Sequence, residues 1–142
     1  MLRGPVLTRK KGWVDMDERD ARQVAEKLWR ALQAGDWETA GGCLHDDFVQ
    51  EWPQSGERVV GRDNAIAIEQ NFPGGLPTMR FRRTLAGGDL AVLETELTYA
   101  DGSRYLGVSI LDLRDGKVLR ETDYYAQPFQ APEWRARWAE RM

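Results

Sequence analysis

Cysteine and histidine are scarce in this chain, which has one of each among 142 residues. The single thiol, Cys43, cannot form an internal disulfide, and we therefore expect a reducing, cytoplasmic setting. The single imidazole, His45, is followed by Asp46 and Asp47. One histidine beside adjacent carboxylates lacks the ligand spacing of a tetrahedral or facial-triad metal site. We expect no metal centre and no Ser-His-Asp or Cys-His pair, and His45 is interpreted as a cation near a helix end.

Excess positive charge and long apolar runs are also missing. Lys and Arg number 20 against 23 Asp and Glu, which gives a net charge of −3 and a pI near 5.3. Nucleic acid and anionic membrane surfaces are therefore unfavourable partners. No apolar run approaches the roughly 20 residues that cross a bilayer. The glycine pairs at 74–75 and 87–88 do not precede a helix, as phosphate-binding loops do, so we expect no organic cofactor.

What the chain does contain is enough apolar sequence for one compact domain. Its hydrophobic content is 42%, and its length suits a single core but not two ordinary ones. Residues 1–16 are interpreted as a loose leader without a signal-peptide cleavage site. Residues 17–142 are expected to form the domain.

The first half of the domain has a helical pattern. Apolar residues recur at helical spacing from Asp17, and Gly35 follows the last of them. Asp36 is expected to cap a second helix. The predicted elements are helices at 17–34, 37–44 and 62–71 and a hairpin of strands at 48–52 and 58–60.

The second half has a strand pattern. Four strands are predicted at 78–85, 90–99, 104–113 and 117–126, with glycine-containing hairpin turns between them. A short helix at 132–141 is expected to place Trp134 and Trp138 on one face. Helices followed by an antiparallel meander indicate an α+β fold, not a βαβ repeat.

Charge alternation predicts how two neighbouring strands pair. Arg80, Arg82 and Thr84 share one face of their strand and are expected to pair with Glu94, Glu96 and Thr98 on a solvated face. The alternate residues then face inward and form an apolar wall. They are Met79, Phe81, Leu85, Leu93, Thr95, Leu97 and Tyr99.

Asp123 is the strongest candidate for chemistry, because it lies among β-forming aromatics shortly before Pro128. An acid at this place points either into water or into a pocket. If it is inward, desolvation would suit it to general acid or base catalysis, with Tyr125 or Tyr99 donating to a developing oxyanion. The alternative is a structural acid that caps backbone amides or pairs with an arginine.

Three motifs make residues from Asp17 onward similar to the SnoaL-like branch of the nuclear transport factor 2-like superfamily. They are Glu51-Trp-Pro-Gln-Ser-Gly-Glu57 with Gly61-Arg62, Asp115-Gly-Lys-Val118, and Glu121-Thr-Asp-Tyr-Tyr-Ala-Gln-Pro-Phe129 followed by Pro132-Glu-Trp-Arg135. The resemblance implies helices packed in a strongly bent antiparallel sheet that forms a cone, an apolar pocket and a homodimer. It also places Asp123 where the Arg-Asp-Asp arrangement of the epoxide hydrolases has an acid. No matching Arg-x-Asp segment is present.

These observations lead to one main hypothesis and two alternatives. The main one is a cofactor-independent isomerase, cyclase or hydrolase that uses Asp123 on a small apolar cyclic molecule. The expected ligand-binding residues are Trp52, Phe81, Leu97, Tyr99 and Tyr125. The alternatives are a non-catalytic binding module for a hydrophobic ligand and a protein-interaction domain that uses the sheet surface. A cavity without an inward acid would favour the binding module.

Overall fold

The computed structural model describes residues 18–142, so the expected leader at 1–16 lies outside the described residues. The helices are α1 (Glu18–Ala34), α2 (Trp37–Gly42), α3 (Arg62–Gln70) and a short 3₁₀ helix η1 (Glu133–Arg135). The strands are β1 (Leu44–Trp52), β2 (Glu57–Val60), β3 (Thr78–Gly87), β4 (Leu90–Thr98), β5 (Arg104–Arg114) and β6 (Lys117–Ala126). Among the described residues, no helix is both long and apolar enough to cross a membrane.

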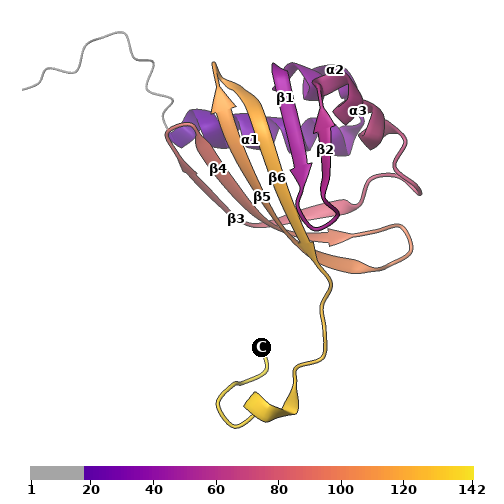
Figure 1. The fold of residues 1–142 in the computed structure, drawn as a ribbon, viewed down its shortest axis with the longest axis vertical. Helices are drawn as coiled ribbons and strands as arrows, with labels where there is room; N and C mark the ends of the chain where they lie inside the picture. The colour runs from indigo at the N-terminus through magenta and orange to yellow at the C-terminus, as the bar shows by residue number, and fades with distance from the viewer. Residues whose placement is uncertain (1–17) are drawn as a thin grey trace, which may run out of the picture.

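The strands form one curved, unclosed sheet in the order β2-β1-β6-β5-β4-β3. In Figure 1, α1 crosses behind the strands, and α2 and α3 lie beside β1 and β2. This arrangement confirms the predicted α+β cone. One strand pair differs from the prediction, since β1 runs parallel to β6 while the other neighbours are antiparallel. The parallel pair joins the two halves of the chain and brings β1 beside the strand that carries Asp123.

Helix α1 supplies one side of the core. Its buried residues, including Ala21, Ala25, Leu28 and Leu32, repeat at a spacing of three and four, so they share one face of the helix. Gly35 ends the helix with a φ of 69°, and its N–H donates to the carbonyl of Leu32. The expected cap of α2 is confirmed, because the Asp36 carboxylate accepts from the Thr39 N–H.

The segment after α2 differs from the prediction. Helix α2 ends at Gly42, and strand β1 already begins at Leu44, where Leu44 pairs with Val118. His45 therefore lies in a strand, not at a helix end. Its Nδ1 accepts a hydrogen bond from the Asp47 N–H. The weak helical propensity of two consecutive glycines and the pairing with β6 together favour the earlier strand.

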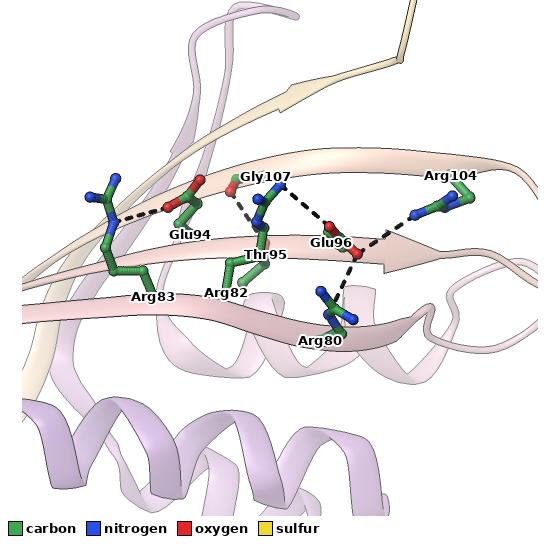
Figure 2. Close-up of polar contacts among 8 residues, drawn as sticks. All are labelled: Arg80, Arg82, Arg83, Glu94, Thr95, Glu96, Arg104 and Gly107. Atoms are coloured by element: carbon green, nitrogen blue, oxygen red, sulfur yellow. Dashed lines mark hydrogen bonds and ion pairs between the residues drawn. The ribbon is translucent and has the colours of Figure 1, made fainter. Parts of the chain in front are cut away.

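The predicted charge pairing between β3 and β4 is confirmed for Arg80 and Arg82 with Glu96 on the outer face of the sheet (Figure 2), whereas Glu94 pairs with Arg83 and Thr84 lies opposite Leu93. Glu96 lies 3.6 Å from Arg80, 3.4 Å from Arg82 and 3.6 Å from Arg104, and Glu94 lies 3.0 Å from Arg83. The arginine side chains are largely exposed to solvent while Glu96 is 19% exposed, so each pair contributes little to stability.

A β-bulge alters the predicted inner face of β3. Phe81 pairs with Thr95, but Arg83 pairs with the next residue, Glu94, which leaves Arg82 as the extra residue. A bulge bends its strand and changes which side chains point inward. As a result Leu85, expected to face inward, is 53% exposed, while Thr84, expected on the solvated face, is partly buried.

The C-terminal segment also differs from the prediction. Only Glu133–Arg135 form a single 3₁₀ turn, in place of a helix at 132–141. Figure 1 shows this segment extending away from the sheet. Trp134 and Trp138 are 74% and 73% exposed, so no packing within the described chain supports a helix here, and short helices need such packing.

Gly107 in β5 leads to a stability prediction, because a side chain there would meet three neighbours. A Cβ atom at Gly107 would lie 2.6 Å from Thr95 Oγ1 and 3.0 Å from Leu97 Cδ1. We expect Gly107→Ala to lower the free energy of unfolding by about 1–3 kcal/mol through overpacking. Urea unfolding measures this change. Gly87→Ala is the matched control, since Gly87 also lies in a strand but has nothing within 4 Å of its Cβ position. Equal stability of the two variants would contradict the prediction.

Candidate functional site

A cavity of about 370 Å³ lies between the inner face of the sheet and the helices α1 and α3. Five aromatic side chains line it, together with aliphatic residues and a few polar groups. The aromatic residues are Trp29, Trp52, Phe72, Tyr99 and Tyr125. The rings of Phe72 and Tyr99 are tilted against each other with centroids 5.8 Å apart. The volume suits a small organic molecule.

Asp123 points into this cavity from β6 and is only 1% exposed. Its Oδ2 accepts from Gln50 Nε2 at 2.8 Å and from Trp52 Nε1 at 3.1 Å, and its Oδ1 accepts from Ser109 Oγ at 2.6 Å. Three donors offset much of the cost of burying a carboxylate. None of the three is charged, so the residue is not neutralised by a salt bridge.

Two further acids lie near Asp123. Glu121 precedes it by two residues on the same face of β6 and is buried, and Glu69 projects from α3. Desolvation, followed by repulsion from Asp123, raises the pKa of Glu69 to about 7. Desolvation first, and then the Asp123 charge, also raises the pKa of Glu121 well above its ordinary value. The site therefore combines a hydrogen-bonded carboxylate with two acids that hold their protons more firmly.

Two tyrosine hydroxyls belong to the same cavity. Burial is the main cause that raises the pKa of Tyr125, and the charges of Asp123, Glu121 and Glu69 add to it. Burial is also the largest cause that raises the pKa of Tyr99, and the charges of Tyr105 and Glu69 raise it further. Both hydroxyls therefore stay neutral and can donate hydrogen bonds at ordinary pH.

The inner end of the cavity holds buried polar atoms without a partner. In the part of the chain that the structure describes, Trp29 Nε1 and Glu121 Oε1 are the two buried side-chain atoms without a hydrogen-bond partner. A smaller space of about 20 Å³ adjoins the cavity here, and Trp29, Gln50 and Glu69 line both. One donor and one acceptor thus remain free at this end.

Gln54, in the turn between β1 and β2, connects the rim of the cavity to β6. Its side-chain amide donates to the carbonyl of Tyr125 and accepts from the N–H of Tyr125. The β1–β6 ladder itself ends at the pair of Glu51 and Thr122. Gln54 therefore continues the contact between the two segments beyond the backbone pairing.

The structure places most of the predicted site residues around the cavity. Asp123, Trp52, Leu97, Tyr99 and Tyr125 all line it. Phe81 does not, and its ring is 39% exposed. Its expected inward position is wrong, because it lies at the β-bulge where β3 bends.

Four residues of the site were not predicted from the sequence: the neutral donors Gln50 and Ser109, and Glu69 and Trp29 on the helices. Gln50 shares its face of β1 with Phe48 and Trp52, and Ser109 lies opposite Asp123 in the register of β5 and β6. The alternation of inward-facing and outward-facing residues along a strand could have predicted that both side chains point inward. Glu69 and Trp29 gave only a helical-spacing signal, which does not distinguish a cavity from a core. Among residues 18–142 no cluster of three or more His, Cys, Asp or Glu is arranged to hold a metal ion.

Comparisons with known proteins agree with the fold. The model of the SnoaL-like domain matches residues 25–121. A solved NTF-2 like protein of unknown function from Burkholderia xenovorans is 36% identical, with a TM-score of 0.79, over 89% of this chain and 98% of that chain. A “putative ketosteroid isomerase” from Kribbella flavida is 32% identical, with a TM-score of 0.81, over 87% of this chain and 90% of that chain.

A more distant structure shares the fold. It is an LEH-like epoxide hydrolase from M. tuberculosis, and it is 22% identical with a TM-score of 0.66, over 75% of this chain and 83% of that chain. The comparison with curated proteins finds no match. The family model covers well over half of the chain, and two solved structures exceed 30% identity over most of it. The chain therefore belongs to the SnoaL-like family and has the nuclear transport factor 2-like fold.

Proposed function

We propose that this protein is a cofactor-independent isomerase that moves a proton on a small, apolar carbonyl compound bound in the cavity. The observation that carries this proposal is the buried Asp123 carboxylate, which is directed into the cavity by three uncharged donors. A fixed, unpaired carboxylate in an apolar site is suited to accept a proton from carbon.

In this mechanism Asp123 is the general base. It removes a proton from the carbon next to the carbonyl, and the negative charge moves onto the carbonyl oxygen. In a substrate with a C=C bond between its β- and γ-carbons, Asp123 then returns the proton to the γ-carbon, the double bond moves to the α,β position and the carbonyl C=O bond re-forms, so that atoms and charge balance. The donors on Asp123 keep its oxygens in place, because Gln50 and Trp52 hold Oδ2 and Ser109 holds Oδ1.

The tyrosine hydroxyls stabilise the oxyanion. Tyr99 and Tyr125 line the same cavity as Asp123, and both remain neutral donors. A donor aimed at developing charge in an apolar site contributes more than it would in water. The likeness to the Kribbella protein supports isomerase chemistry in particular, because the two chains are 32% identical over most of their lengths.

The experiment is deuterium exchange into β-tetralone, a cyclic ketone with acidic protons, followed by proton NMR. The wild-type protein is expected to accelerate exchange over buffer. Tyr125→Phe is expected to reduce the acceleration about tenfold to a hundredfold, because the oxyanion loses a donor. Tyr124→Phe is the matched control, since Tyr124 is exposed and points away from the cavity. Exchange no faster than in buffer would overturn the proposal.

A further inference from the structure

We propose that the natural ligand carries a protonated amine, which the Glu69 carboxylate and the aromatic rings of the cavity hold together. The inference rests on the proposed function in placing the ligand in this cavity, and it adds the chemical class of that ligand. Glu69 has no part in the proton transfer described above, so this acid is available for binding.

The first argument is the charge of the cavity wall. Three carboxylates line it, Glu57 near the rim, Glu69 from α3 and Asp123 from β6. Among residues 20–142, whose side chains the structure describes, no lysine, arginine or histidine lines this cavity. Arg82 and Arg83 of β3 pair with Glu96 and Glu94 on the opposite face of the sheet (Figure 2). An anionic ligand would be repelled here, whereas a cation would meet opposite charge in an environment of reduced dielectric.

The second argument is the aromatic lining. Trp52, Phe72 and Tyr99 stand around the same space as Glu69, and the tilted pair of Phe72 and Tyr99 forms one wall. An ammonium group is attracted to the face of an aromatic ring, and this attraction grows when water is excluded. Rings combined with carboxylates are therefore complementary to an apolar molecule that bears one positive charge.

The third argument is independent of the acids that face the cavity. The Trp29 indole N–H is 93% buried, lines the cavity and has no partner among the described residues. Glu121 Oε1, next to the same inner end, is also free. Buried polar atoms without partners are rare and costly. A protonated amine can donate to Glu121 Oε1, and an acceptor elsewhere on the ligand, such as a carbonyl oxygen, can accept from the Trp29 N–H, whereas a hydrocarbon can do neither.

The acid–base properties of the site agree with this inference. Desolvation and the negative charge of Asp123 raise the pKa of Glu69 to about 7. Below that pH the proton on Glu69 removes the repulsion between the two acids. A bound ammonium supplies the same positive charge and would allow Glu69 to ionise. The charged and titratable groups that face Glu69 are Asp123, Glu121, Tyr99 and Tyr125.

Three probes of matched shape test the inference: the cation naphthylethylamine, the neutral alcohol naphthylethanol, and naphthaleneacetate, the carboxylate anion of naphthaleneacetic acid. Their dissociation constants are measured by calorimetry at about pH 8, where Glu69 is ionised and the amine is protonated. The amine is expected to bind at least about tenfold more tightly than the alcohol, and the acetate most weakly. An alcohol or acetate that binds as tightly as the amine would overturn the inference, and so would an amine that does not bind.

A matched pair of variants locates the effect. Glu69→Gln is expected to weaken amine binding about tenfold and to leave alcohol binding unchanged. Glu94→Gln removes the same charge from the opposite face of the sheet, so it should change neither. Equal losses for amine and alcohol in Glu69→Gln would mean a merely structural role and would overturn the assignment of Glu69.

The two proposals fail separately. Deuterium exchange into β-tetralone without any preference for the amine would sustain the proposed isomerase and overturn the amine inference. Preferential amine binding without exchange would sustain the amine site and overturn the isomerase.

Discussion

Asp123→Asn is expected to lower the rate of deuterium exchange into β-tetralone by about a hundredfold to ten-thousandfold, the range typical of removing a general base. An amide cannot accept the proton, whatever its position. The variant should still fold, because Asn is nearly isosteric with Asp. The side-chain oxygen of Asn can accept hydrogen bonds from Gln50 and Trp52, and its amide NH2 can donate to the rotatable hydroxyl of Ser109.

Two controls separate lost chemistry from lost structure. Asp112→Asn makes the same change at an exposed position of β5 and should leave the exchange rate unchanged. The thermal midpoint and the affinity for naphthylethanol of Asp123→Asn report whether the cavity persists. An Asp123→Asn variant that retains both the cavity and the wild-type exchange rate would eliminate Asp123 as the base.

The second large effect is a loss of stability as the pH rises. The folded pKa of Glu69, about 7, lies above the value of 4.5 of an unperturbed glutamate. Between these two values the folded state binds more protons than the unfolded state, so the free energy of unfolding falls with increasing pH. Glu121 contributes with the same sign, because its pKa is also raised in the folded state.

Urea unfolding at about pH 4.5 and at about pH 8 measures this effect. Relative to Glu69→Gln, the wild-type protein is expected to lose on the order of 1–3 kcal/mol between the two conditions, a figure reduced from the full pKa difference because Glu69 is partly solvent-exposed. Glu94→Gln, with an acid on the outer face, should follow the wild-type curve. A difference between wild type and Glu69→Gln that does not change with pH would contradict the burial of a proton at this site.

Much of the fold followed from patterns that are local in the sequence. Helical spacing, the Asp36 cap and the glycine turns were sufficient for the element order, and charge alternation was sufficient for the pairing of Arg80 and Arg82 with Glu96. The bulge was not predictable in this way. It inserts one residue at Arg82, and no glycine or proline lies next to this position in the strand to mark it. Phe81 was therefore assigned to the wrong environment.

The candidate site was only partly predictable. Asp123 was selected as a candidate among β-forming aromatics with its direction left open, and in the structure it is buried and lines the cavity. Its hydrogen-bond partners were not predicted, because neutral side chains give no charge signal in the sequence. Gln50 and Ser109 are neutral residues, and Gln50 is 73 residues away in the sequence. Their convergence depends on the parallel pairing of β1 with β6, which no local pattern encodes.

The amide side chain of Gln54 has a mechanical consequence for the cavity. A primary amide carries a donor and an acceptor on neighbouring atoms, as a peptide group does, and Gln54 uses both on the backbone of Tyr125. The side chain thus acts as one additional rung between the turn and β6. A ligand that pushes the turn outward must also displace the strand that bears Tyr125 and Asp123. Occupancy at the entrance and alignment of the base are therefore coupled through Gln54, in addition to the hydrogen bonds that Gln50 and Trp52 donate to Asp123.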